Sequence, residues 1–419
     1  MKFSFLLGFL FLNLLAAAQQ DSFYLLKADQ VFDGENMHKD WVVLVKGNTI
    51  EAAGPMNFKL PATTRIIEMK GATLLPGLIE GHSHLFLHPY NEKSWDYQVL
   101  HESRAERTLR AGNHAKATLL AGFTTVRDLG TEGAQYDDAG LKQSIEKGII
   151  DGPRMIIASK AIVAKGAYGP KSDNPDLDLP QGAAEVGNRE EMEKEVRLQL
   201  SKGADVIKIY ADHRPVKDGP LVPAFTIDEI KVAVILAGNQ GKKVVVHANS
   251  REGMQRAISA GVSTIEHGNE GDESIFMQMK EKSIAYCPTL AAAEAIATYS
   301  GWRKGLDPLP AVIEQKKKSF SAALKSGVTI CMGGDAGVFT HGENAREMEL
   351  MVEYGMKPLE VLRSATSVNA DVFGTNKKIG RIKKGLLADL VAVNGDALTM
   401  SNLHHILFLM KNGKIYQQP

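Results

Sequence analysis

The segment LIEGHSHL, residues 78–85, joins a short apolar run to two histidines, His82 and His84, that stand two positions apart. In a β-strand, side chains two positions apart point to the same face. Two neutral imidazoles on one face at a strand end can bind one divalent metal ion. A lone His-x-His pair is weak evidence, because surface or core histidines also produce it. The fold that contains this strand must therefore be inferred from the rest of the chain.

Seven further short apolar runs follow along the chain, and stretches with helical spacing separate them. The runs are TTVRDLG, RMIIAS, VIKIYAD, VVVHAN, TIEHG, AYCPTL and TICMGGDAG. Segments between them, such as EEMEKEVRLQLSKG and SREGMQRAISAG, have helical spacing and a glycine near the end. Eight parallel strands alternating with helices predict an α/β fold, namely a (β/α)8 TIM barrel over residues 77–371. A doubly wound sheet is disfavoured, because no glycine-rich dinucleotide loop follows an early strand.

Both ends of the chain are rich in strand-like sequence. Residues 19–76 include YLLKADQVFDG, DWVVLVKGNTIEAAG and TRIIEMKGATLLPG, and residues 372–419 include ADLVAVNGD and HHILFLMKNGKIYQ. Glycine and asparagine interrupt these runs where tight turns are expected, and Asn412-Gly413 is a hairpin signal. We therefore predict one small β-sandwich domain that is built from both terminal segments.

Residues 1–18 differ from everything that follows. Lys2 precedes the apolar run FSFLLGFLFLNLLAAA, which ends in small residues before Gln19 and Gln20. This pattern predicts a secretory signal peptide that is cleaved near Ala18, and hence an exported protein, periplasmic or secreted. The alternative is an uncleaved membrane anchor, although the run is short for a membrane span.

The overall composition excludes several classes of protein. Lys and Arg together number 49, as do Asp and Glu, so the formal net charge is zero. Without a basic excess to neutralise phosphates, nucleic-acid binding is excluded as the main role. We expect a small-molecule substrate and no stable membrane span after signal cleavage, and we leave a homo-oligomer open. Cys287 and Cys331 cannot form a disulfide scaffold; their apolar surroundings indicate core residues, although an oxidising compartment permits a bond between them.

Several other predicted barrel strands also end in residues of the kinds that bind metals. His247 closes VVVHAN, His267 closes TIEHG and Asp335 closes TICMGGD. The carboxyl ends of barrel strands meet on one rim, where barrel enzymes carry out their chemistry. We therefore expect these three side chains to converge with His82 and His84.

Lys208 lies inside VIKIY, an apolar strand that should be buried. A buried ammonium group without a partner is costly. Either Lys208 pairs with a nearby carboxylate, Asp128 or Asp335, or CO2 converts its amine into a carbamate that bridges two metal ions. A desolvated lysine with a lowered pKa reacts more readily in its neutral form. The residues alone leave both explanations open.

With these segments in order, the chain resembles the amidohydrolase superfamily, in particular its imidazolonepropionase-like and prolidase-like branch, related to Xaa-Pro dipeptidases. The resemblance rests on LLPGLIEGHSHL, AGFTTVRDLG, KGADVIKIYAD, VVVHANSREGMQRAISAGVSTIEHG, YCPTL, SGVTICMGGDAG, GRIKKGLLADLVAV and MKNGKIY, which cover nearly the whole mature chain. It implies two metal ions bound by six side chains: His82, His84, Lys208, His247, His267 and Asp335. The first two histidines would bind the buried ion and the other two the second ion. The lysine would be carbamylated and bridge them, and the aspartate would bind metal and transfer a proton.

The implied function is binuclear metal-dependent hydrolysis of an amide C–N bond, in a dipeptide or an N-acyl amino acid. Two divalent ions, zinc for this ligand set, can share a hydroxide, while Asp335 takes its proton and passes it to the leaving nitrogen. Hydrolysis of a cyclic amide or an imidazolone-type ring is the alternative. A non-catalytic binding protein on the same barrel is the third interpretation. The loss of Asp335 or of one of the histidines would indicate such a protein, and none of them is missing.

Residues that would contact the substrate are less clearly marked. Tyr210 is two positions beyond Lys208 and should share its face, so we predict it as a catalytic hydrogen-bond donor. The related dipeptidases often carry a histidine in the loop after strand three, where this chain has KGAYGP with Tyr168. That departure puts their substrate preference in question. Arg127 and Asp128 at the end of strand two indicate a structural ion pair. Four further pocket candidates follow strands one and four: His88, Tyr90, His213 and Arg214.

Overall fold

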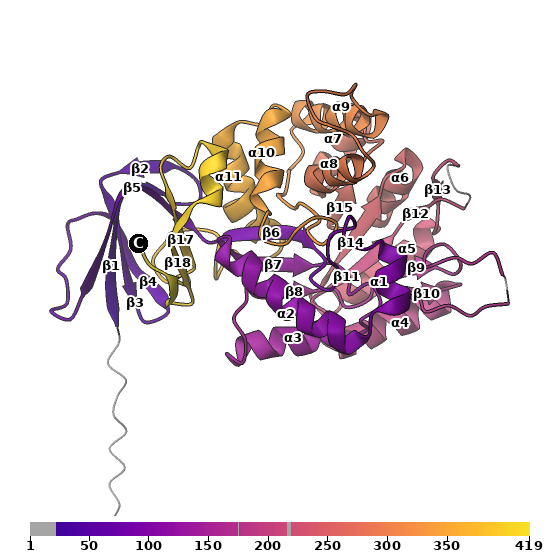
Figure 1. Ribbon diagram of the computed structural model, residues 1–419, viewed down its shortest axis with the longest axis horizontal. Helices are drawn as coiled ribbons and strands as arrows, with labels where there is room; N and C mark the ends of the chain where they lie inside the picture. The colour runs from indigo at the N-terminus through magenta and orange to yellow at the C-terminus, as the bar shows by residue number, and fades with distance from the viewer. Residues whose placement is uncertain (1–21, 175, 216–218) are drawn as a thin grey trace, which may run out of the picture.

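The computed structural model describes residues 22–174, 176–215 and 219–419. The chain has two parts, a sheet built from both of its ends and a larger body in which strands and helices alternate (Figure 1). The predicted signal peptide, residues 1–18, lies outside the described residues. Within the described part of the chain, no helix is long and apolar enough to cross a membrane.

One eight-stranded sheet joins the two ends of the chain. Strand β17 pairs antiparallel with β5, with Leu390 opposite Pro76, so the C-terminal strands extend the N-terminal sheet. A two-residue turn at Asn412 and Gly413, with φ of 50° and 74°, closes the last hairpin as the sequence predicted. The strands are β1 (Phe23–Phe32), β2 (Met37–Lys39), β3 (Trp41–Lys46), β4 (Thr49–Pro55), β5 (Arg65–Pro76), β17 (Leu390–Asn394), β18 (Ile406–Lys411) and β19 (Lys414–Gln417).

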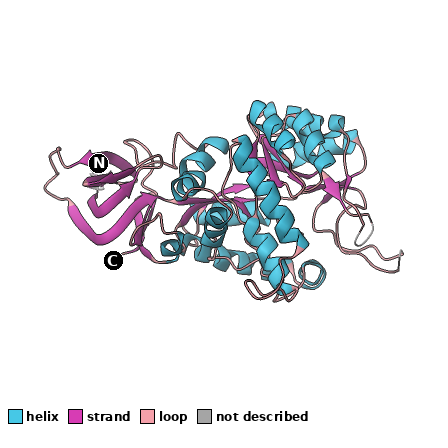
Figure 2. Cartoon of the chain, turned by 90° about the horizontal axis from the view of Figure 1, so that it is seen from above, coloured by secondary structure: helices cyan, strands magenta, loops and turns pink. Residues whose placement is uncertain are grey.

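The terminal sheet has an apolar core of its own. Phe408 of β18 shares a buried cluster with Val43 of β3 and Ile50 of β4, although these strands lie toward opposite ends of the sheet. The sheet therefore curves around one interior, as a small β-sandwich does (Figure 2). The domain limits drawn from the sequence, 19–76 and 372–419, stay predictions.

The larger body contains two parallel sheets, β6-β7-β8 and β10-β9-β11-β14-β15-β16. Backbone hydrogen bonds connect the sheets: on one side Asp205 donates to the carbonyl of Ile157 over 2.7 Å. On the other side, residues 329–336 lie between β16 and β6 and accept hydrogen bonds from Tyr286 and Gly81. This closure makes the predicted (β/α)8 barrel. Its strands are β6 (Leu78–Ser83), β7 (Phe123–Asp128), β8 (Arg154–Ile157), β9 (Ile162–Ala164), β10 (Ala184–Val186), β11 (Val206–Tyr210), β14 (Lys243–Ala248), β15 (Thr264–His267) and β16 (Ala285–Cys287).

Two of the predicted barrel strands are irregular. Strand three breaks near Ser159, whose φ is 62°, into β8 and β9, which pair with different neighbours and so divide the barrel into two sheets. The sequence predicts a strand over TICMGGDAG, but the structure has only isolated bridges there, including Ile330 with Tyr286. This segment packs closely against β6: a Cβ at Gly333 would lie only 2.8 Å from the backbone nitrogen of His82.

Helices cover the outside of the barrel (Figures 1 and 2). Thr226 and Glu229 form a capping box at the start of α5, and the Ser250 side chain accepts the N–H of Gly253 at the start of α6. The helices are α1 (Trp95–His101), α2 (Arg104–Leu120), α3 (Asp137–Glu146), α4 (Arg189–Ser201), α5 (Ile227–Gly238), α6 (Arg251–Ala260), α7 (Glu273–Glu281), α8 (Leu290–Tyr299), α9 (Ala311–Ser326), α10 (Ala345–Glu353), α11 (Pro358–Arg363) and α12 (Asn369–Val372). A short antiparallel pair, β12 (Asp212–His213) and β13 (Val222–Pro223), follows strand four.

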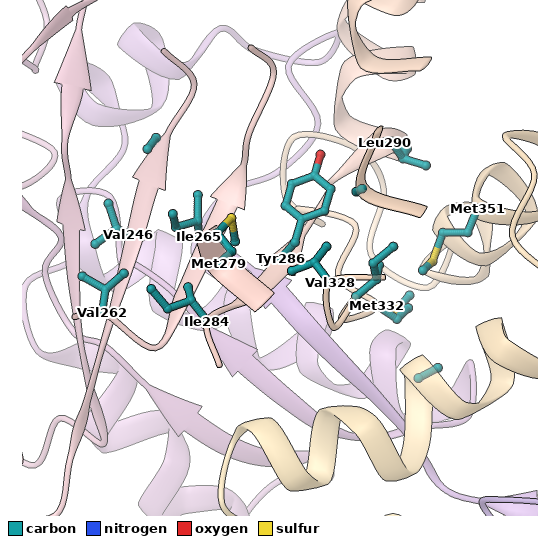
Figure 3. Close-up of a cluster of buried hydrophobic side chains, with 14 of the residues drawn as sticks. Val246, Val262, Ile265, Met279, Ile284, Tyr286, Leu290, Val328, Met332 and Met351 are labelled. Carbon is teal, nitrogen blue, oxygen red and sulfur yellow. The ribbon is translucent and has the colours of Figure 1, made fainter. Parts of the chain in front are cut away.

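The barrel core is drawn in Figure 3, around strands β14, β15 and β16. Val246, Ile265 and Tyr286 from these three strands lie in one buried cluster with Met279 of α7 and Met351 of α10. Truncating a large side chain in such a core typically costs about 2–5 kcal/mol. This packing holds the carboxyl ends of the strands at fixed positions, and those ends carry the site.

Candidate metal centre and active site

Six side chains that the sequence singled out lie together at the carboxyl ends of barrel strands: His82, His84, Lys208, His247, His267 and Asp335. The ring centroid of His267 lies 4.9 Å from that of His82 and 4.3 Å from that of His247. Oδ1 of Asp335 is 3.4 Å from Nε2 of His84 and 3.7 Å from Nε2 of His82. Lys208 is close enough to lower the pKa of both His82 and His247 through its charge. The convergence that the strand-end pattern predicted is therefore present.

Three of these side chains carry a buried polar atom without a hydrogen-bond partner among the described residues: His82 Nε2, Lys208 Nζ and Asp335 Oδ1. An unpaired buried polar atom costs about 1–3 kcal/mol. Three of them in one place are explained by a bound group that satisfies them together. The ligand atoms of His82, His84 and Asp335 all lie within 4.8 Å of one another, and nitrogen and carboxylate ligands suit a divalent transition metal. The residues present thus fit a metal.

Burial keeps the imidazoles of His82, His247 and His267 neutral. Desolvation lowers the pKa of His82 and His267 well below the usual value and lowers that of His247 to about 3. Neutral imidazole is the form that binds a metal ion. Desolvation acts in the opposite direction on the carboxyl group of Asp335 and raises its pKa.

Neighbouring groups determine which ring nitrogen two of the histidines present. Nδ1 of His84 donates to the carbonyl of Gly130 over 2.9 Å, which leaves the lone pair on Nε2. Nδ1 of His82 lies 2.9 Å from Oε2 of Glu266, and Oε1 of that carboxylate accepts from Arg127 over 2.9 Å. Such partners orient metal-binding imidazoles and raise their basicity. The predicted ion pair of Arg127 exists, with Glu266 as its partner.

Two buried glutamates that support the cluster, Glu80 and Glu266, were missed by reasoning from the sequence. Oε1 of Glu80 accepts the backbone N–H groups of His82 and Gly334, each over 2.9 Å, and Oε2 accepts from Asn344. This carboxyl group ties strand β6 to the loop that carries Asp335. Burial raises the pKa of Glu80 to about 7. The signal in the sequence was the same as for the strand-four lysine, namely a charged residue inside an apolar strand.

Lys208 is fully buried, and its Nζ forms no hydrogen bond with any described residue. No described ion pair joins Lys208 to Asp128 or to Asp335; Oδ1 of Asp128 accepts the backbone N–H of Leu85. Desolvation lowers the pKa of Lys208 to about 8, which increases the neutral fraction near neutral pH. A buried, unpaired amine of lowered pKa is the form that reacts with CO2.

His267 and Asp335 both have a left-handed backbone, with φ of 70° and 66°. Non-glycine residues rarely adopt this conformation, and they keep it where the surrounding structure enforces it. The carbonyl of His267 accepts hydrogen bonds from Lys316 Nζ over 2.8 Å and from the Tyr286 hydroxyl over 3.0 Å. Its Nδ1 lies 2.8 Å from the hydroxyl of Thr289. These contacts hold the turn that directs the imidazole into the cluster.

A cavity of about 260 Å³ borders the cluster and is open to the outside. Four of the metal-ligand candidates line it: His84, His247, His267 and Asp335. Small and medium apolar side chains form part of the wall: Leu87, Ala292, Ala293, Ile296, Val312 and Val338. The cavity therefore gives a small molecule access to the cluster and offers it an apolar surface.

Tyr210 lines this cavity, as its position two residues beyond Lys208 predicted. Its ring stacks on that of His247, with centroids 4.6 Å apart. Its hydroxyl donates to Oε1 of Glu132 over 3.2 Å, and the hydroxyl of Tyr168 donates to Oε2 over 2.8 Å. Reasoning from the sequence missed Glu132. Its signal was an acidic residue in the loop directly after a barrel strand, where barrel enzymes place functional groups.

The weaker pocket candidates separate into two groups. Tyr90 lines the cavity, whereas both ring nitrogens of His88 contact glutamates of the surrounding loop and helix. His213 and Arg214 line a smaller hollow of about 170 Å³, which shares Tyr168 with the main cavity. Their predicted contact with a substrate stays a prediction.

Cys287 and Cys331 are both free and buried in one apolar cluster. Burial raises the pKa of Cys331 to about 12 and that of Cys287 well above its usual value. Thiols that resist ionisation are poor nucleophiles. The two cysteines act as small core residues, as their apolar surroundings indicated.

Comparison with known proteins extends this picture. Residues 73–417 match the model of the amidohydrolase family. Ochratoxinase from Aspergillus niger is 29% identical over 378 residues, covering 83% of this chain and 76% of its own. Imidazolonepropionase from Fusobacterium nucleatum subsp. nucleatum is 21% identical over 427 residues, covering 91% of this chain and 92% of its own.

A solved structure is also similar over most of the chain. The crystal structure of a Xaa-Pro dipeptidase with methionine bound in the active site has a TM-score of 0.84 and 33% identity, covering 94% of this chain and 100% of the dipeptidase. These proteins fall in the superfamily and branch that the motifs resembled, and they support the TIM-barrel fold. The chain is a hydrolase acting on carbon–nitrogen bonds and belongs to the amidohydrolase family.

Proposed function

We propose that the protein hydrolyses the amide bond of a dipeptide or an N-acyl amino acid at a centre of two divalent metal ions. The observation that carries this proposal is the convergence of three unpaired buried atoms, on His82, Lys208 and Asp335. Burying unpaired polar groups opposes folding. A purely structural core would therefore not gather them here, whereas a site that binds a cationic ligand needs them. The relatives named ochratoxinase and Xaa-Pro dipeptidase support an amide as the substrate.

The ligands divide naturally between two ions. One ion would be held by the three side chains whose ligand atoms share one site: His82, His84 and Asp335. The neighbouring imidazoles of His247 and His267 would hold the other. Addition of CO2 to the neutral amine of Lys208, with release of one proton, would place a carboxylate between them. Two bound divalent ions, zinc for this ligand set, supply an activated water at neutral pH and polarise the scissile carbonyl.

Asp335 is the proton carrier in this proposal. Its carboxylate lines the cavity, its Oδ1 bonds to no described residue, and burial raises its pKa. Asp335 accepts the proton of the attacking water and delivers it to the leaving nitrogen. Tyr210, which lines the same cavity, is placed to donate to the carbonyl oxygen as negative charge develops on it.

Hydrolysis at defined metal content tests the proposal. The protein is stripped with a chelator, reloaded with zinc, manganese or cobalt, and assayed on dipeptides, N-acyl amino acids and cyclic amides. We expect activity to follow metal content and to reach its maximum near two equivalents per chain. Ring opening without cleavage of linear amides would contradict the proposed substrate class. A folded protein that binds no divalent metal would contradict the whole proposal and favour a binding protein.

A further inference from the structure

Glu132 is a buried carboxylate that lines the active-site cavity and that the hydrolytic chemistry leaves without a role. It lies in the loop after β7 and is 1% exposed. Its two oxygens accept hydrogen bonds from Trp95 Nε1 over 2.9 Å, Tyr168 over 2.8 Å and Tyr210 over 3.2 Å. All three donors are neutral. An ionised carboxylate accepts about four hydrogen bonds, so one acceptor position remains for a ligand.

No described lysine or arginine forms an ion pair with Glu132. Among the described residues, the basic group within ion-pair distance of Glu132 is His84, whose Nδ1 lies 3.7 Å from Oε1. That nitrogen already donates to the carbonyl of Gly130. The buried guanidinium of Arg107 is near enough for its charge to act on Glu132, but it donates to the carbonyls of Phe86 and Thr131 and forms no direct ion pair with this carboxylate. Buried carboxylates are normally compensated by a cation. The structure assigns that place to a cation carried by the ligand.

The surroundings of the carboxylate are those of a site for an ammonium group. The ring of Tyr168 lies 4.8 Å from that of Trp95 and 4.9 Å from that of Tyr210, measured between centroids. Tyr90 completes the aromatic side of the cavity. Aromatic faces attract cations, and rings grouped around a negative charge favour an alkylammonium over a neutral group of similar size.

One imidazole ring separates Glu132 from Asp335 at the reaction centre. The imidazole of His84 stands between two carboxylates, with Nδ1 at 3.7 Å from Glu132 and Nε2 at 3.4 Å from Asp335. The α-ammonium nitrogen of a dipeptide is two bonds from the carbon of its scissile carbonyl. A substrate whose amide lies over Asp335 therefore brings its own α-ammonium group, rather than a distant part, toward Glu132.

We propose that Glu132 binds the free α-ammonium group of the substrate and so selects dipeptides over N-acyl amino acids. This inference rests on the hydrolase function proposed above and narrows its substrate class. The acyl group of an N-acyl amino acid has no ammonium group to offer this carboxylate. A carboxylate in the same place would be repelled by Glu132.

The first test compares two substrates of equal size, alanyl-phenylalanine and N-isobutyryl-phenylalanine, an N-acyl amino acid in which a methyl group replaces the ammonium group. We expect kcat/KM of the wild type to favour the free amine by about 10- to 100-fold, the size of effect a charge-assisted hydrogen bond provides. Glu132→Gln should bring the ratio close to one. Glu102→Gln is the matched control, because it removes a carboxylate that contacts His88 and does not line the cavity. Its ratio should equal that of the wild type.

The second test measures binding without turnover, so that failure of the two proposals can be told apart. Calorimetry compares 2-phenylethylamine with the neutral 2-phenylethanol on metal-loaded protein at a pH where the amine is charged. We expect the wild type to bind the amine about tenfold more tightly than the alcohol. Glu132→Gln should bind the two probes equally. Equal binding of the two probes by the wild type, or a preference for N-isobutyryl-phenylalanine over the dipeptide, would overturn the role of Glu132.

The combined outcomes separate the inference from the hydrolase function. Hydrolysis of N-isobutyryl-phenylalanine in preference to the dipeptide leaves the hydrolase function standing and removes the inference. If neither substrate is cleaved but amine binding depends on Glu132, the inference stands and the proposed reaction fails for this substrate. If Glu132→Gln does not fold, the substrate and probe preferences of the wild type decide by themselves.

Discussion

Oδ1 of Asp335 lies 3.4 Å from Nε2 of His84, where the last barrel segment, residues 329–336, lies beside the first strand, β6. In the neutral form of His84 both atoms are acceptors, because Nδ1 donates its proton to the carbonyl of Gly130. Two lone pairs directed at each other repel unless a proton or a cation lies between them. A bound divalent ion relieves this repulsion, and the unpaired Nε2 of His82, 3.7 Å from the same carboxylate oxygen, adds a third ligand.

Replacing Asp335 by Asn tests its role in proton transfer. The variant keeps the size of the side chain and removes its basicity, so we expect kcat to fall by about 10²-fold or more. The fold should persist, because Oδ1 makes no hydrogen bond to a described residue that the substitution would break. Steady-state kinetics and thermal unfolding measure the two effects. Turnover near that of the wild type would remove Asp335 from its assigned role.

Tyr210→Phe tests whether the Tyr210 hydroxyl donates to the developing oxyanion. That hydroxyl donates to Glu132 over a long 3.2 Å. Because the hydroxyl has a single proton, it has to leave Glu132 in order to donate to the carbonyl oxygen. We then expect kcat to fall by about 10²-fold with little change in KM. A loss confined to KM would instead show that Tyr210 serves only to hold Glu132.

The metal-free protein should lose stability as the pH falls. The pKa of His247 is about 3 in the folded protein, against an ordinary value of 6.5. Between these values the unfolded chain binds a proton that the folded chain does not, so the free energy of unfolding falls by about 1.4 kcal/mol per pH unit for this group. Denaturant unfolding of chelator-treated protein at pH 7 and pH 5 measures the loss. His247→Gln should lose less over the same interval, and equal losses would contradict the prediction.

We propose that residues 1–18 are removed when the protein is exported. The small residues before Gln19 form the expected cleavage site, so the mature chain should begin near Gln19. Intact mass spectrometry of protein from the native host, after separation of membranes, measures the N-terminus. A chain that still begins at Met1 and remains in the membrane fraction would favour the anchor.

The barrel and the convergence of its strand-end side chains could be predicted because both follow from local patterns. Apolar strands with a ligand-type residue at the carboxyl end fix which side chains share the rim, as for His247 and His267. The supporting carboxylates could not be predicted in the same way. Glu266 is placed beside His82 by pairing between distant strands, and Glu132 is positioned by a loop whose course depends on the tyrosines around it. Such contacts depend on three-dimensional packing, which the spacing of residues along the chain does not encode.

Lys208→Ala tests the bridging role of this lysine. If Lys208 carries a carbamate, the variant should lose bound metal and activity together, because two cations would face each other without a shared anion. Acetate or propionate should partly restore both by placing a carboxylate in the vacated space. Metal analysis and kinetics with and without the added acids measure this. Loss of barrel stability without any rescue by acids would support a plain structural lysine instead.

The most direct measurement of the metal centre is a crystal structure of the active, metal-loaded enzyme, with anomalous maps to locate the ions. The account predicts two neighbouring metal peaks among the six ligand side chains and continuous density beyond Nζ of Lys208 for a carboxylate bound to both ions. An unmodified lysine amine in a fully metallated and active enzyme would contradict the carbamate. A single peak or none at this cluster, in an enzyme that still hydrolyses amides, would contradict the binuclear centre itself.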